Sequence, residues 1–139
     1  MLFRIAGSVA VFVTLASQIW AQAAPTVTVV GRINHTITGQ PILVPDNPDV
    51  ILSIAEFPPG AKLAEHKHIY PHLAYVMQGV LTVTNRETGE SYVVRQGDFV
   101  AEMQNVWHSG MNKGSVPVKL LIIDTVPHGL PDNVERPAQ

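Results

Sequence analysis

Residues 60–79 read GAKLAEHKHIYPHLAYVMQG and contain three of the six histidines of the chain, His66, His68 and His72. His66 and His68 are two positions apart, and on a β-strand this spacing places both side chains on the same face. His72 follows four residues later. Imidazole nitrogen binds zinc, copper, iron and nickel. The stretch therefore suggests one side of a metal site built on a strand.

A fourth histidine, His108, lies 36 residues after His72, in the stretch GDFVAEMQNVWHSGMN at residues 97–112. A first-row metal ion needs three or four ligands that converge at about 2.0–2.2 Å. Histidines from one strand, its neighbour and a distant strand can meet inside a small β-barrel. The same histidines could instead be surface residues or hydrogen-bonded core residues, as a single histidine usually is.

The chain reads as a series of short strands and has no helical pattern of ten or more residues. Runs of β-branched and apolar residues alternate with turn residues, which favours a β-sandwich or a barrel. A proline-rich stretch at Thr38–Asp49 is unsuited to a central strand. The expected strands are Thr26–Ile33, Val50–Phe57, Leu63–His68, Leu73–Gln78, Val80–Asn85, Ser91–Arg95, Phe99–Met103, Trp107–Met111 and Val116–Val126.

Composition excludes several classes of protein. A chain of 139 residues with 46% hydrophobic and 14% charged residues is expected to form one folded domain. The net charge is −2 and no basic cluster is present, so we expect no nucleic-acid partner. The absence of cysteine excludes disulfides, thiolate zinc sites, iron–sulfur clusters and cysteine nucleophiles.

The N-terminal residues 1–23 have the layout of a secretory signal peptide. Arg4 precedes an uncharged apolar run, and Ala21-Gln22-Ala23 forms a small-x-small cleavage site. The alternative is an uncleaved membrane anchor, but the run Ile5–Trp20 has 16 residues, short of the roughly 20 that span a bilayer. We therefore expect an exported protein, periplasmic or secreted, with no stable membrane anchor after cleavage.

The spacing of glycines and histidines in the two stretches resembles the two motifs of the cupin superfamily. Residues 60–79 follow the order glycine, five residues, His-x-His, three residues, His72, six residues, glycine. Residues 97–112 follow the order glycine, five residues, Met-Gln-Asn, two residues, His108, three residues, asparagine. The segment between the motifs, Val80–Gln96, has 17 residues. The resemblance implies an all-β, single-domain jelly-roll β-barrel with one divalent metal in its mouth.

Three positions depart from the family pattern. His72 stands where the first motif has glutamate, and Met103 and Asn105 stand where the second has proline and glycine. Asn105 is an understandable substitute for glycine, because asparagine tolerates positive φ. The resemblance implies that His66, His68 and His108 bind the metal, with His72 as fourth ligand or as a residue lining the pocket. Without a carboxylate the site would keep the full charge of the ion.

An apolar, partly aromatic pocket is expected around the metal, lined by residues next to the ligands in sequence. The nearby carboxylates Glu56, Glu65 and Glu102 are weak candidates for a catalytic role. His35 and His128 fall outside the motifs and are expected to be ordinary surface histidines. The pocket candidates are Tyr70, Tyr75, Met77, Met103 and Trp107.

These observations predict a metal-dependent cupin that acts on a small organic molecule in the periplasm, as a dioxygenase, isomerase or lyase. The alternative is a periplasmic cupin that binds a metal or small ligand without turnover. One divalent transition metal per chain is expected (Cu, Zn, Fe, Mn or Ni), and a homodimer is the expected assembly. The expected regions are the signal peptide 1–23, an N-terminal strand and proline-rich arm at 24–49, the barrel at 50–126 and a C-terminal tail at 127–139.

Overall fold

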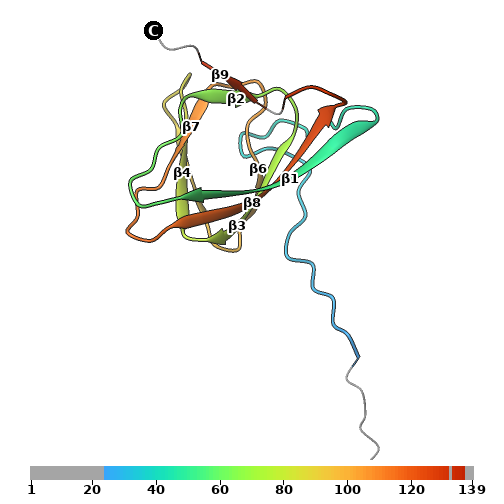
Figure 1. Ribbon diagram of the computed structural model, residues 1–139, viewed down its shortest axis with the longest axis horizontal. Coiled ribbons are helices and arrows are strands. Elements are labelled where there is room, and N and C mark those ends of the chain that lie inside the picture. The colour runs from blue at the N-terminus through green and yellow to red at the C-terminus, as the bar shows by residue number, and fades with distance from the viewer. Residues whose placement is uncertain (1–23, 132, 137–139) are drawn as a thin grey trace, which may run out of the picture.

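The computed structural model describes residues 24–131 and 133–136, and these residues form strands and loops without a helix (Figure 1). The predicted signal peptide, residues 1–23, lies outside the described residues. Within them, no helix has the length and hydropathy needed to span a bilayer. The strands are β1 (Pro48–Phe57), β2 (His66–His68), β3 (His72–Gln78), β4 (Val80–Asn85), β5 (Ser91–Arg95), β6 (Phe99–Ala101), β7 (His108–Met111), β8 (Val118–Pro127) and β9 (Asn133–Glu135).

The strands form two antiparallel sheets that face each other. One sheet has the order β1-β8-β3-β6 and the other the order β5-β4-β7-β2-β9. The longest pair is β1 with β8, in register from Pro48 opposite Pro127 to Phe57 opposite Val118. The strand ladders stay within each sheet, so the predicted all-β jelly roll is confirmed, although its sheets do not close into one continuous barrel.

The core lies between the two sheets, because alternate residues of each strand point inward. Strand β8 shows this alternation along its whole length, with every second side chain buried. The inward side chains form one apolar cluster between the sheets. This cluster consists of Phe57, Val76, Leu81, Val83, Val94, Met103, Val118, Leu120 and Ile122.

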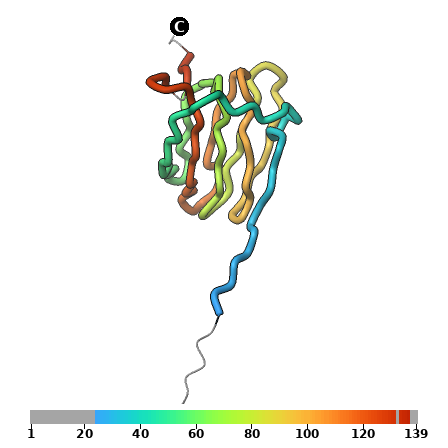
Figure 2. The backbone as a smooth tube through the Cα atoms, turned by 90° about the vertical axis from the view of Figure 1, so that its right-hand side faces the viewer, coloured from blue at the N-terminus to red at the C-terminus, as the bar shows by residue number. Residues whose placement is uncertain are grey.

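Two segments of the described chain differ from expectation. The expected strand at Thr26–Ile33 is wrong: this segment forms no strand, and its first residues run away from the sheets (Figure 2). No strand of the described chain pairs with it, so its backbone has no ladder to join. The tail, expected to be a loose surface segment, contributes strand β9. β9 pairs with the open edge of β2, placing Glu135 opposite His66 and Asn133 opposite His68.

Candidate metal centre

Strands β2 and β7 bring three histidines together between the sheets. His66 and His108 lie directly opposite each other in the ladder, and His68 shares the face of His66. The ring centroid of His66 lies 4.5 Å from that of His108 and 5.0 Å from that of His68. All three residues are buried. The predicted convergence of His66, His68 and His108 is therefore present in the structure.

The hydrogen bonds of two of these rings determine which nitrogen points into the cluster. Nδ1 of His66 lies 2.8 Å from the carbonyl oxygen of Ala64, and Nδ1 of His108 lies 2.8 Å from that of Val106. A carbonyl oxygen only accepts, so each Nδ1 carries the proton and donates it. In the neutral ring the lone pair is then on Nε2, which is the arrangement found for histidines that bind a metal.

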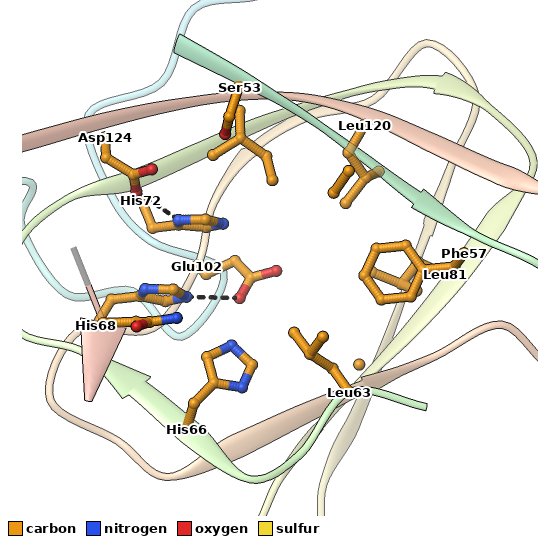
Figure 3. Close-up of a pocket in the computed structure, with 14 residues that line it drawn as sticks. Ser53, Phe57, Leu63, His66, His68, His72, Leu81, Glu102, Leu120 and Asp124 are labelled. Atoms are coloured by element: carbon orange, nitrogen blue, oxygen red, sulfur yellow. Dashed lines mark hydrogen bonds and ion pairs between the residues drawn. The ribbon is translucent and has the colours of Figure 1, made fainter. Parts of the chain in front are cut away.

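Glu102 adds a carboxylate to the three imidazoles. Its backbone follows β6 and is fixed by a hydrogen bond from its N–H to the carbonyl oxygen of His72. One carboxylate oxygen, Oε2, lies 2.9 Å from Nε2 of His108. The same oxygen lies 3.5 Å from Nε2 of His68, the contact drawn as a dashed line in Figure 3. Ligand atoms of His66, His68, Glu102 and His108 all lie within 4.8 Å of one another. The four side chains thus offer three nitrogens and one oxygen to a single ion.

Glu102 was not predicted to belong to this group, since we considered it only as a weak catalytic candidate. The signal was present in the sequence, because Glu102 is a single acidic residue inside the apolar run Phe99–Met103. A charged residue is rarely buried unless it is paired or binds a metal. In this chain the carboxylate comes from within the second motif, directly after β6, and His72 occupies the position where the first motif has glutamate.

His72 lies beside the four-residue cluster and has a different set of contacts. Its ring stacks on that of His68, and its Nδ1 pairs with the buried carboxylate of Asp124 on β8. His68, His72 and Asp124 form a second group of closely spaced donor atoms that shares His68 with the first. The structure therefore places His72 between a carboxylate and a candidate ligand. Asp124 was not predicted, and its signal is again a single acidic residue in a largely apolar strand.

Burial and mutual contacts set the protonation of the cluster. Burial lowers the pKa of His66 and of His68, so both rings favour the neutral form that binds metals. Burial alone would raise the pKa of Glu102, but its contacts with His108 and His68 outweigh burial and hold that pKa well below its ordinary value. Burial also lowers the pKa of His108, and the Glu102 carboxylate beside it reverses this, so that the net shift is upward.

The nitrogens of the cluster suit a cation. Among the described residues, Nδ1 of His68 is buried without a hydrogen-bond partner, and the buried Nε2 atoms of His68 and His108 face Oε2 of Glu102 at 3.5 and 2.9 Å. Buried polar atoms are normally paired, and each one left unpaired costs about 1–3 kcal/mol. An ion bound at the centre of the cluster would satisfy Nε2 of both rings. Three imidazoles and one carboxylate suit the borderline first-row divalent ions.

The cluster forms one wall of a cavity of about 150 Å³ (Figure 3). His66, His68, His72 and Glu102 point into it, and so does Asp124. The opposite wall is apolar. The complete lining is Ser53, Ala55, Phe57, Leu63, His66, His68, His72, Leu81, Glu102, Gly110, Leu120, Ile122, Asp124 and Asn133.

None of the five pocket candidates lines this cavity. Met103 is fully buried in the core, whereas Met77 is exposed. Tyr75 lines a separate hollow with Phe99 and Leu121. Tyr70 is half-buried outside the lining, and Trp107 lies under the guanidinium of Arg136, 4.7 Å from its ring centre.

The remaining sequence candidates lie away from the site. His35 and His128 are exposed as expected, and His128 pairs with Asp49. Glu56 forms an exposed ion pair with Lys119, and Glu65 pairs with Arg86. The substituted turn residue Asn105 has φ 55°, which agrees with its expected role in place of glycine.

Comparisons with known proteins agree with this geometry. The family model described as a cupin domain matches residues 53–124, a little over half of the chain. No curated protein matches the chain by sequence. An uncharacterised conserved protein with a double-stranded β-helix domain from Klebsiella pneumoniae is similar in structure, with a TM-score of 0.54 and 17% identity over 70% of this chain and 81% of that chain.

Two structures of named enzymes share the fold. The polyketide cyclase RemF from Streptomyces resistomycificus has a TM-score of 0.53 and 18% identity, over 63% of this chain and 62% of that chain. The oxalate decarboxylase of Lactobacillus farciminis has a TM-score of 0.52 and 21% identity, over 62% of this chain and 26% of that chain. This chain thus spans about a quarter of the decarboxylase. At these identities the likeness concerns the fold alone.

Proposed function

The chain belongs to the cupin family, and we propose that it is a metal-dependent enzyme that acts on a small organic molecule. The observation that carries the proposal is the convergence of ligand atoms from His66, His68, Glu102 and His108 next to a cavity. A bound ion there would supply a Lewis acid, or a redox centre if it is iron, manganese or copper. Proteins of this fold include a polyketide cyclase and an oxalate decarboxylase, which supports an enzyme without naming its reaction.

The residues of the chain have separate tasks in this proposal. The three imidazoles and the Glu102 carboxylate would hold the ion, and the carboxylate would reduce the net charge of the site by one. His72, fixed by Asp124, adds a polar group to the cavity wall that the head of a substrate can contact. The facing apolar wall excludes water from the same space. The arrangement suits dioxygenase, isomerase or lyase chemistry.

Elemental analysis tests the proposal most directly. The protein is purified without an affinity tag, and its metal content is compared with that of a Glu102→Gln, His108→Ala double variant. We expect one equivalent of a divalent transition metal (Cu, Zn, Fe, Mn or Ni) in the unchanged protein and none in the double variant. A His35→Ala variant is the control, since it removes an exposed imidazole far from the cluster. No metal in the purified protein, with none bound on titration, would refute the proposal.

Turnover requires a second measurement. Oxygen uptake and a screen of small organic acids, with the metal-loaded protein, separate an enzyme from a protein that only binds its ligand. Ligand-dependent oxygen uptake or product formation, lost in the double variant, would establish catalysis. Saturable binding without any product would favour the alternative of a binding cupin.

We also propose that the protein is exported, on the basis of the signal-like residues 1–23. Determining the N-terminal residue of the protein recovered from the periplasmic or secreted fraction tests this. We expect the mature chain to begin at Ala24.

A further inference from the structure

The cavity beside the candidate metal centre has two chemically different halves. His66, His68, His72, Glu102 and Asp124 form the polar half. Phe57, Leu63, Leu81 and Leu120 gather on the opposite side, as Figure 3 shows. A ligand that fills the whole cavity must therefore have a polar end and an apolar end.

The apolar half is built by three strands that turn small or apolar side chains inward. Phe57 lies at the end of β1 and Leu120 near the start of β8, while Leu81 comes from β4 of the opposite sheet. All three are less than 10% exposed. Gly110 on β7 faces the same half of the cavity. A Cβ added at this glycine would lie 3.5 Å from Cδ2 of Leu81, an ordinary van der Waals contact. The surface is apolar, which favours hydrocarbon.

The volume of the cavity limits the length of such a ligand. At about 150 Å³ it is close to the engineered apolar cavities that hold one benzene molecule. This volume corresponds to roughly six carbon atoms. A ligand charged at both ends would bring a charge against Phe57 and Leu120 without a partner, and such burial is strongly unfavourable.

We infer that the site takes a monoanionic or neutral molecule of about six carbons in all, with an oxygen-donor head and an aliphatic or aromatic apolar tail. The head would lie at the four-residue cluster and the tail against Phe57, Leu81 and Leu120. The placement of the head rests on the proposed function, because the head would contact the metal centre. The placement of the tail depends only on the apolar half of the cavity.

A series of straight-chain carboxylates tests the inference by isothermal titration calorimetry. The probes are acetate, butyrate, hexanoate, octanoate and decanoate, with benzoate as the compact aromatic member, and the protein is loaded with the metal that it retains. Each added methylene should tighten binding by about fourfold, the equivalent of roughly 0.8 kcal/mol, as far as about hexanoate. Longer chains should gain nothing or bind more weakly. Equal affinity along the whole series would overturn the inference.

A matched pair of variants locates the tail. Gly110→Ala adds one methyl group to the apolar half, and its backbone is outside the left-handed region. It should move the optimum to a shorter chain while leaving the affinity for acetate within about twofold. Val93→Ile is the control, because it adds one carbon at an exposed position of β5 in the same sheet. A similar chain-length profile in both variants would place the tail elsewhere and overturn the inference.

A neutral probe separates failure of this inference from failure of the proposed function. Butanol, hexanol and octanol are titrated into metal-free protein, where the metal plays no part. The same gain of about fourfold per methylene supports the apolar subsite even if the protein binds no metal. A protein that binds one metal ion but shows no dependence on chain length with either series would retain the proposed function and refute the subsite.

Discussion

The ring of His72 stacks on the ring of His68, with centroids 3.8 Å apart and planes 6° apart. The ring of His72 is itself held in place by Asp124, whose carboxylate pairs with Nδ1 of His72. Nδ1 of His68 has no hydrogen-bond partner that would orient the ring. The ring of His72, held by Asp124 and stacked on His68, therefore orients the ring of His68. In His66 and His108 a hydrogen bond from Nδ1 to a backbone carbonyl oxygen orients the ring.

Glu102→Gln should weaken metal binding more than His72→Gln. The first variant removes a charged donor from the cluster, whereas the second removes a neighbour of a ligand, which typically costs about 10–100-fold in metal affinity. Competition with a chelator of known affinity measures both values. Glu56→Gln, on an exposed carboxylate, is the control. An equal or larger loss in His72→Gln would mean that His72 binds the ion directly, as the motif pattern allowed.

His66→Ala should abolish stoichiometric metal binding and remove the stabilisation that the metal gives. A metal present at 100 times its Kd adds about 2.7 kcal/mol to the free energy of unfolding of the loaded protein. Thermal unfolding with and without added metal measures this difference. The melting temperature of the unchanged protein should rise with metal, and that of the variant should not. Retention of one equivalent of metal in the variant would contradict the assignment of His66.

Asn112 should contribute strongly to stability, because its buried side chain joins three backbone groups. Its Nδ2 donates to the carbonyl oxygens of Phe57 and Val116, and its Oδ1 accepts from the N–H of Gly114. Asn112→Ala would leave these groups unpaired, at about 1–3 kcal/mol for each one that water cannot reach. Urea denaturation measures the change. A loss below about 0.5 kcal/mol would show that water replaces the amide.

Two motif glycines should differ in their tolerance of alanine. Gly79 and Gly97 both have positive φ, 80° and 92°. A Cβ at Gly79 would lie 2.7 Å from the carbonyl oxygen of Pro117, whereas nothing lies within 4 Å of one at Gly97. Gly97→Ala should therefore cost only the backbone term of about 1–2 kcal/mol. Gly79→Ala should cost a further 1–3 kcal/mol or so for the overlap. Urea denaturation measures both losses, and equal losses of stability in the two variants would contradict the overlap at Gly79.

The spacing of the motifs was sufficient to predict the jelly roll and the meeting of His66, His68 and His108. It could not predict Glu102, because this carboxylate, directly after β6, replaces the one missing from the first motif. Only the folded chain brings it beside His68 and His108. Strand β9 was missed for a related reason. Its three residues have little strand pattern of their own, and their pairing depends on the free edge of β2.

The pocket candidates, chosen for being close to the ligands in sequence, lie outside the lining of this cavity. Trp107 immediately precedes His108, and neighbouring residues of an extended chain point to opposite faces. Trp107 accordingly lies outside the cavity, under Arg136. The residues that do line the apolar half, such as Phe57 and Leu120, are distant from the histidines in sequence. Their place in the cavity follows from the pairing of β1 with β8.

We propose that two copies of the chain associate through the outer face of the sheet β1-β8-β3-β6. Strand β1 is an edge strand, and its outward residues Val50, Leu52 and Ile54 are 66%, 66% and 49% exposed. Antiparallel sheets normally have a polar outer face, and contiguous exposed apolar residues mark interaction surfaces. Light scattering after size exclusion should give the mass of two mature chains. Leu52→Lys should shift this mass to that of one chain, while Val116→Lys, at an exposed position between β7 and β8, should leave it unchanged. A single-chain mass for the unchanged protein would contradict the proposal, and the outer face would then need a different partner.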